Sequence, residues 1–163
     1  MAASKRLALD TNVLIDRANE APFVKEFMAA FRGRGYSLEV PPTAIIELVH
    51  LRKIGTENER DLAALVLSSL LDWEITPLVL SDTEIMYKEN FVAIAQEMRL
   101  LPPREVSDLH VLAETAIKEI PALVTSDRAL LDIDRVALHL AFQNAGLASV
   151  SPVHPDRMLK ALR

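Results

Sequence analysis

Short apolar runs alternate with longer amphipathic stretches along the whole chain, and this alternation predicts strands and helices in turn. Short apolar runs predict strands at residues 5–9, 36–40, 121–125 and 147–150, with a strand-like segment at 74–80 that Pro77 interrupts. Longer stretches predict helices at residues 22–31, 43–53, 57–71, 81–100, 108–119, 134–145 and 154–162. Strands separated by helices pair in parallel through right-handed crossovers. We therefore expect an α/β protein: a three-layer α/β/α sandwich around a short, mostly parallel central sheet.

Helix-capping residues mark several boundaries of these elements. Thr43 follows Pro41-Pro42 and is expected to cap the helix that Gly55 ends. Ser81 and Glu84 have the spacing of a capping box. Beyond the break at Pro102-Pro103, either Ser107 or Asp108 is expected to cap the next helix.

The length and composition indicate a compact protein of one domain, residues 1–163. No cysteine is present, which excludes disulfides and thiolate metal sites and fits a reducing cytosol. The apolar run that ends at Asp10 is too short for the core of a signal peptide and far too short to span a bilayer. We expect a cytoplasmic protein with no membrane association.

The net charge of −5 argues against a simple nucleic-acid-binding module, since such modules usually present a basic face. It does not argue against a nuclease, because divalent cations reverse the local sign of a carboxylate cluster. Basic pairs such as Arg32/Arg34, Arg52/Lys53 and Arg99/Arg104 could guide a phosphate backbone, although solvated helix ends are the preferred explanation for each pair.

Four acidic residues are expected at one edge of the sheet. Asp10 ends the first strand, and Asp127 follows the strand at residues 121–125. Glu47 and Asp108 lie in the first turns of helices that follow loops. Ligands of open parallel sheets bind beyond the carboxyl ends of the strands, where these acids would meet. Carboxylates without a nearby histidine or cysteine suit magnesium or manganese rather than zinc.

Each acid also has a structural interpretation. Asp10 and Asp108 could cap helices, Asp127 could be a turn residue, and Glu47 could lie on a helix surface. It is less plausible that all four acids serve only structural roles than that any single one does. Two further acids, Asp132 and Asp134, follow Asp127 closely, so that either could join the site or replace Asp127. Asp16 is expected on the helix surface, and His50 is expected to be structural.

Four segments resemble the motifs of the PIN-domain family, in the family's order. Leu7–Leu14 (LALDTNVL) resembles the opening strand with Asp-Thr-Asn, and Pro42–Leu48 (PTAIIEL) resembles the second motif, which supplies a Glu. Ser107–Ala113 (SDLHVLA) is similar to the third, and Val124–Asp127 (VTSD) to the fourth, Thr-x-Asp after a strand. The tail over residues 145–159 resembles the family's closing strand and helix. The resemblance therefore spans the chain, except for residues 57–100, which match no motif and are expected to serve helical packing or a partner surface.

The resemblance implies a Rossmann-like fold and a magnesium- or manganese-dependent endoribonuclease that uses metal-activated water and leaves a 5′ phosphate. Asp10, Glu47, Asp108 and Asp127 would be both metal ligands and catalytic residues. Supporting polar groups would come from Thr11, Asn12, Thr125 and Ser126. The size looks most like a VapC-type toxin, which implies an RNA substrate, a cognate antitoxin and often a homodimer.

Two other functions remain open at this point. A Rossmann-like phosphatase would use Asp10 as a nucleophile, but such enzymes generally carry Asp-x-Asp after the first strand, and here Asn12 occupies the second position. A catalytically inactive PIN-like domain would bind RNA or protein, yet all four acids are retained and the charge balance is acidic.

Overall fold

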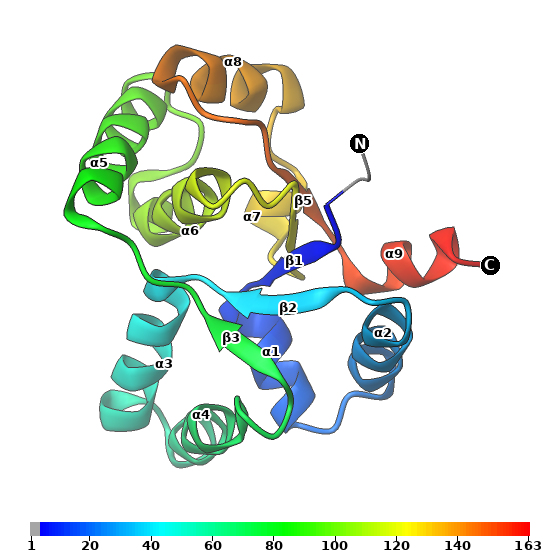
Figure 1. Ribbon diagram of the computed structural model, residues 1–163. Coiled ribbons are helices and arrows are strands. Elements are labelled where there is room, and N and C mark those ends of the chain that lie inside the picture. The colour runs from blue at the N-terminus through cyan, green and yellow to red at the C-terminus, as the bar shows by residue number, and fades with distance from the viewer. Residues whose placement is uncertain (1–3) are drawn as a thin grey trace.

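Five parallel strands form a single sheet in the order β3-β2-β1-β4-β5 in the computed structural model, which describes residues 4–163 (Figure 1). The strands are β1 (Arg6–Leu9), β2 (Ser37–Val40), β3 (Ile75–Pro77), β4 (Ala122–Val124) and β5 (Ser151–Val153). β1 is the central strand, with β2 and β4 as its neighbours. The predicted parallel sheet is therefore confirmed. Residues 1–3 of the predicted single domain, 1–163, lie outside the described residues.

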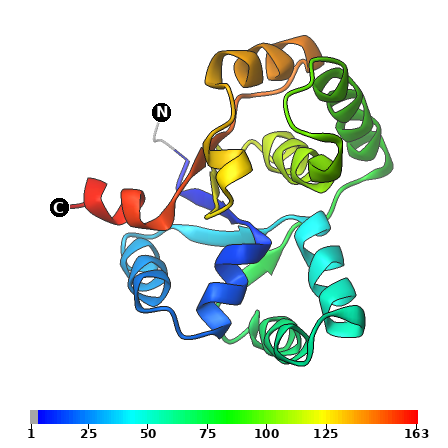
Figure 2. The same cartoon turned by 180° about the vertical axis from the view of Figure 1, so that it is seen from behind.

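Helices cover both faces of this sheet, as the expected α/β/α sandwich requires (Figures 1 and 2). Their bounds are α1 (Thr11–Ala18), α2 (Pro22–Gly33), α3 (Pro42–Ile54), α4 (Glu57–Ser69), α5 (Asp82–Glu97), α6 (Val106–Ile117), α7 (Arg128–Leu131), α8 (Arg135–Ala145) and α9 (Pro155–Ala161). A short 3₁₀ turn, η1 (Pro103–Glu105), precedes α6. Within residues 4–163, no helix combines the length and the apolar character that a membrane span needs.

Alternation along the strands divides the buried side chains into two cores. Leu7 and Leu9 of β1 face the core formed with α1, α2, α3, α4 and α9. Ala8, between them, faces the core formed with α5, α6 and α8. β4 repeats the pattern, because Leu123 faces the α5–α6–α8 side and Val124 the other. Successive strand side chains point to opposite faces, so a sheet covered on both sides carries apolar residues throughout.

The helix that carries Glu47 begins one residue earlier than predicted, and Thr43 is not its cap. Pro41 occupies the N-cap position of α3, and its ring has no side-chain hydrogen bond to offer. The exposed end of the helix is satisfied from another helix: the Glu114 carboxylate of α6 accepts from the Thr43 N–H at 3.0 Å and from the Thr43 hydroxyl at 2.7 Å. Lys88 of α5 lies 3.4 Å from the same carboxylate. A residue remote in sequence thus replaces the local cap.

Two other predicted boundaries are also wrong. Neither Ser107 nor Asp108 caps α6, because the 3₁₀ turn brings Glu105 to the N-cap position and places Asp108 inside the first turn. The last strand lies at Ser151–Val153 rather than at 147–150. The Leu147 N–H donates to the Phe142 carbonyl and so closes the end of α8. Residues 148–150 are therefore the connection from α8 to the edge of the sheet, and the strand begins only after them.

The Glu114 cap makes a stability prediction. Glu114 is fully buried, and its removal leaves the Thr43 donors and the Lys88 ammonium without their acceptor. We expect Glu114→Ala to lower the free energy of unfolding by about 3 kcal/mol in urea denaturation. The control Glu89→Ala, at an exposed position of α5, should change it by less than ~0.5 kcal/mol. Equal stability of the two variants would contradict the capping role.

Candidate functional site at the carboxyl edge of the sheet

Asp10 lies at the end of the central strand and is 3% exposed. Its Oδ1 accepts from the Thr11 N–H at 2.8 Å, so that it caps α1 as its structural interpretation predicts. Its Oδ2 accepts from the Thr125 hydroxyl at 2.8 Å and from the Asn12 amide at 3.4 Å. Burial raises the pKa of Asp10, and the hydrogen bond from Thr125 opposes that rise. The carboxylate is therefore fixed in place by donors from three directions.

Glu47 approaches Asp10 from α3. The Thr11 hydroxyl donates to Glu47 Oε2 at 3.2 Å, whereas Glu47 Oε1 is buried and has no hydrogen-bond partner among residues 4–163. Burial, together with the nearby Asp10 carboxylate, raises the pKa of Glu47 to about 7. An unsatisfied buried carboxylate oxygen costs free energy, so this atom is suited to binding a cation.

Asp108 approaches from the first turn of α6 and has a second orphan oxygen. Its Oδ2 is buried and receives no hydrogen bond from the described part of the chain. Burial raises the pKa of Asp108 to about 8, with further contributions from Asp10, Asp127 and Glu105. One carboxylate oxygen from each of Glu105, Asp108 and Asp127 lies within 4.8 Å of the other two. These three acids are close enough to share one cation.

Asp127 is the N-cap of α7, three residues after the end of β4. Its Oδ1 accepts from the Ala129 N–H at 2.8 Å, and its own N–H donates to the Thr125 hydroxyl oxygen at 3.0 Å. Asp127 is therefore a helix cap as well as a member of the acidic cluster. Capping and membership of the site are compatible, because a cap uses only one of the two carboxylate oxygens.

All four predicted acids line one pocket of about 290 Å³, together with Asp16. Thr11 and Asn12 line the pocket too. The buried Thr125 does not line it, but its hydroxyl donates a hydrogen bond to Asp10 and so holds the Asp10 carboxylate in place. Ser126 contributes through its backbone, whose N–H donates to Asn12 Oδ1 at 3.0 Å. The Ser126 side chain itself makes no hydrogen bond with any of residues 4–163, so its predicted supporting role stays a prediction.

Two acids at the site were not predicted, and two proposed substitutes lie elsewhere. Glu105 is three residues before Asp108, and Asp16 is four residues after Asn12, which are the spacings of residues on one helix face. That spacing is the signal that would have found them. Asp132 and Asp134 are exposed and do not line the pocket. The Asp134 carboxylate instead caps α8 by accepting from the Ala137 N–H.

The donor set fits a hard divalent cation. Among residues 4–163, no lysine, arginine, histidine or cysteine lines the pocket, so the side chains there supply no positive charge to the clustered acids. Two buried oxygens, on Glu47 and Asp108, have no partner. Oxygen-only sites of this kind suit magnesium or manganese. The acids, their orphan oxygens and the lack of local cations are all accounted for by metal binding.

Solved structures with the same fold include chains from three bacteria. A chain of VapBC2 from Rickettsia felis, solved bound to a DNA fragment from the promoter, aligns with 91% of this chain and 98% of its own length, with a TM-score of 0.64 and 11% identity. VapBC-1 from nontypeable Haemophilus influenzae aligns with 92% and 98%, with a TM-score of 0.59 and 13% identity. FitAcB from Neisseria gonorrhoeae aligns with 91% and 97%, with a TM-score of 0.57 and 14% identity.

At the level of sequence, no family model and no curated protein matches the chain. The predicted resemblance is thus confirmed for the fold, which at these identities is what the structural similarity establishes. The chemistry of the site must be argued from its own geometry.

The raised pKa values predict how stability depends on pH. Glu47 and Asp108 bind protons more tightly in the folded protein, where their pKa values are about 7 and about 8, than in the unfolded chain. Their contribution to stability is therefore complete below pH ~4 and is lost as the pH rises through about 7 and 8. In chelator, we expect the melting temperature to fall between these limits, and manganese to restore it at the alkaline end.

Asp108→Asn removes one of the clustered charges. In chelator at alkaline pH it should stabilise the protein by roughly 2 kcal/mol, which raises the melting temperature by roughly 4–8 °C. The variant should gain less than the wild type from manganese. A variant that melts below the wild type at every pH would instead assign Asp108 a structural role.

Proposed function

We propose that the protein is a magnesium- or manganese-dependent endoribonuclease whose active site is the carboxylate pocket. The observation that carries the proposal is the pair of buried oxygens without partners, Glu47 Oε1 and Asp108 Oδ2, in a pocket lined by acids and by no basic side chain of residues 4–163. Such an arrangement is unfavourable for a structural core and suited to holding cations beside a phosphodiester.

Each residue of the pocket has a role that follows from its position. Asp10, Glu47, Asp108 and Asp127 would hold one or two cations, with Glu105 close enough to join Asp108 and Asp127. A divalent cation bound there supplies Lewis-acid chemistry, because it neutralises phosphate charge and lowers the pKa of a bound water. Thr125 and Thr11 hold the Asp10 and Glu47 carboxylates in the orientation that binding requires.

The two other functions fit the geometry less well. A nucleophilic aspartate needs a free oxygen, whereas both Asp10 oxygens accept hydrogen bonds and the side chain is almost fully buried. A purely binding domain gives no reason to keep the orphan oxygens of Glu47 and Asp108. The nuclease proposal explains both observations.

A cleavage assay tests this proposal. Purified protein should cut a mixed panel of structured and unstructured RNAs with manganese or magnesium and not with chelator. We expect Asp10→Asn to lower the rate by about 100-fold or more, because it removes a charge from the cation site. Asp132→Asn is the matched control: it is exposed, outside the pocket, and should cut at the wild-type rate.

Calorimetry with manganese completes the test. Stoichiometric binding that Asp10→Asn weakens, without cleavage of any RNA on the panel, would support a cation site with a narrower RNA target. No binding and no cleavage by the wild type would favour the inactive domain. Equal cleavage by Asp10→Asn and the wild type would contradict the assignment of the site.

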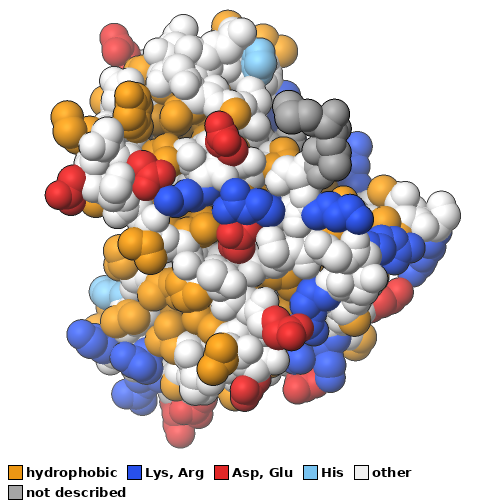
Figure 3. Space-filling view, in the orientation of Figure 1, with side chains coloured by type: hydrophobic (Ala, Val, Ile, Leu, Met, Phe, Trp, Pro, Cys, Tyr) orange, Lys and Arg blue, Asp and Glu red, His pale blue; other side chains and the backbone are white. Residues whose placement is uncertain are grey.

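We further propose that the protein is the cytoplasmic toxin of a toxin–antitoxin pair and that it forms a homodimer. The toxin proposal rests on the resemblance and on the fold shared with the VapBC and FitAcB chains. The dimer proposal is supported by the α3–α5 face, where hydrophobic side chains gather beside α3 and the segment joining β3 to α5 (Figure 3). The α3–α5 face comprises the exposed residues Ile46, Val79 and Ile85, which line one surface hollow. Exposed apolar patches of this kind mark interfaces.

The dimer can be tested by charge substitution. Val79 is 76% and Ile46 65% exposed, so a double Glu substitution there should leave the fold intact and weaken self-association at least about tenfold. Light scattering after gel filtration should show dimer for the wild type and monomer for the variant. Val136→Glu, at an equally exposed position of α8, should remain dimeric. A monomeric wild type would contradict the proposal.

A further inference from the structure

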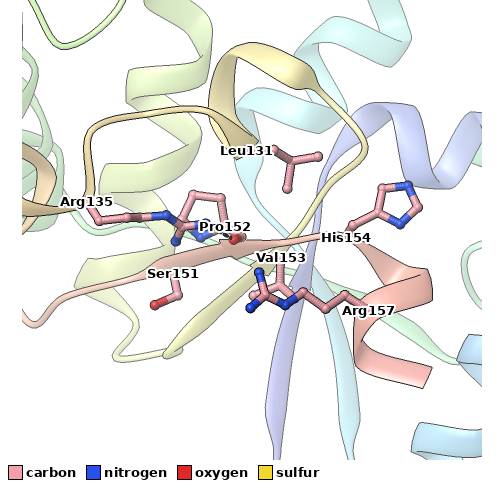
Figure 4. Close-up of a pocket in the computed structure, with 7 residues that line it drawn as sticks. All are labelled: Leu131, Arg135, Ser151, Pro152, Val153, His154 and Arg157. Carbon is pink, nitrogen blue, oxygen red and sulfur yellow. Dashed lines mark hydrogen bonds between the residues drawn. The ribbon is translucent and has the colours of Figure 1, made fainter. Parts of the chain in front are cut away.

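A second pocket, of about 640 Å³, lies along the outer edge of β5 and contains two arginines (Figure 4). Arg135 reaches into it from α8 and Arg157 from α9, so that the two side chains extend toward β5 from opposite sides. Leu131, at the end of α7, and His154 also line it. No described residue that lines it is acidic, although acids outnumber lysines and arginines in the chain by 23 to 18. We name it the arginine pocket.

The two guanidinium groups retain most of their hydrogen-bonding capacity. Arg135 donates one bond, from Nη2 to the Pro152 carbonyl at 2.7 Å, which orients its planar group along β5. Arg157 makes no side-chain hydrogen bond with any of residues 4–163. A guanidinium group has five N–H donors in a fixed fork, a geometry that matches two oxygens of a phosphate.

Arg135 and Arg157 are both exposed, and they differ from the basic residues that are paired with an acid. Arg6 is paired with Glu39 at 2.8 Å, and Lys118 is paired with Glu84 at 3.1 Å. Neither arginine of the arginine pocket forms such a pair within the described chain. Two unpaired arginines that face one concavity in an acidic protein create a positive potential there, which attracts an anion.

The arginine pocket adjoins the carboxylate pocket through two elements. Asp127, the N-cap of α7, lines the carboxylate pocket, and Leu131, the last residue of α7, lines the arginine pocket. On the other side, His154 lines the arginine pocket and lies near Asp16, which lines the carboxylate pocket. Stacking of His154 on Phe23, with ring centroids 5.9 Å apart, holds this boundary in place.

We propose that the arginine pocket binds a backbone phosphate of the same RNA strand whose scissile phosphate lies in the carboxylate pocket. This inference rests on the proposed nuclease function and adds a binding site to it. Arg157 and Arg135 bind the phosphate through charge-assisted hydrogen bonds and so contribute to affinity for RNA rather than to the chemical step. A strand held at two points has a fixed direction through the active site.

The test measures RNA binding without cleavage. A short fluorescein-labelled single-stranded oligoribonucleotide is titrated with protein in chelator, and fluorescence anisotropy is followed over a series of salt concentrations. We expect Arg157→Gln to raise Kd about tenfold and to lower the slope of log affinity against log salt by about 0.7, the value for one lost phosphate contact on a single strand. Arg135→Gln should act in the same direction. Arg60→Gln, an exposed arginine of α4, is the matched control and should change neither quantity.

The outcomes separate this proposal from the nuclease proposal. If Arg157→Gln weakens RNA binding but the wild type neither binds manganese nor cleaves RNA, the arginine pocket stands and the nuclease assignment fails. If Arg157→Gln and Arg60→Gln both bind like the wild type, or the wild type binds no RNA at low salt, the arginine pocket is overturned whatever the cleavage result. In manganese, a true phosphate contact also raises KM for Arg157→Gln while kcat stays unchanged. Unchanged melting temperatures confirm that the variants are folded.

Discussion

Burial of the Asp10 carboxylate at the end of the central strand is the constraint on which the rest of the site depends. A buried carboxylate needs donors, and its donors come from the start of α1 through the Thr11 N–H and from the end of β4 through the Thr125 hydroxyl. Asn12 then joins the two loops, because its amide bonds to Thr125 and its carbonyl oxygen accepts from the Ser126 N–H. Asp127, the next residue, is thereby placed beside Asp10. One satisfied carboxylate thus positions a second acid.

A different contact sets the distance between the other two acids. Glu47 and Asp108 lie on α3 and α6, and these helices are tied together by the Glu114 carboxylate, which binds the first turn of α3 through Thr43. Lys88 of α5 neutralises Glu114, so this internal cap adds no net charge to the interior. The acids near the pocket therefore fall into two kinds. Glu114 is fully paired and structural, whereas Glu47 and Asp108 each retain an unpaired oxygen.

Sequence patterns predicted the features that depend on the order of residues along the chain. They missed the features that depend on contacts between residues far apart in the sequence. The parallel sheet and the meeting of Asp10, Glu47, Asp108 and Asp127 follow from strand–helix alternation, since the carboxyl ends of parallel strands share one edge. The caps at Thr43 and Asp108 were wrong because the actual partners, Glu114 and a 3₁₀ turn, are set by tertiary packing. Glu105 and Asp16 were missed because residues on a helix face are recognisable as site residues only once that face is oriented. Short elements were equally hard to find: α7 and the position of β5 have no periodicity long enough to detect.

The segregation of charge explains how an acidic protein could act on a polyanion. With a net charge of −5, the chain as a whole repels RNA, and that repulsion acts over a Debye length of about 8 Å at physiological salt. Cations in the carboxylate pocket would reverse the sign at one point only, which would fix a phosphate but leave the strand free to rotate about it. The unpaired arginines at the β5 edge would supply a second point of attraction, at an offset set by α7. An RNA strand that reaches both attractive sites gains enough binding energy to overcome the repulsion from the rest of the surface, whereas a strand that reaches only one does not. The net negative charge of the protein therefore favours RNAs of suitable shape and disfavours others.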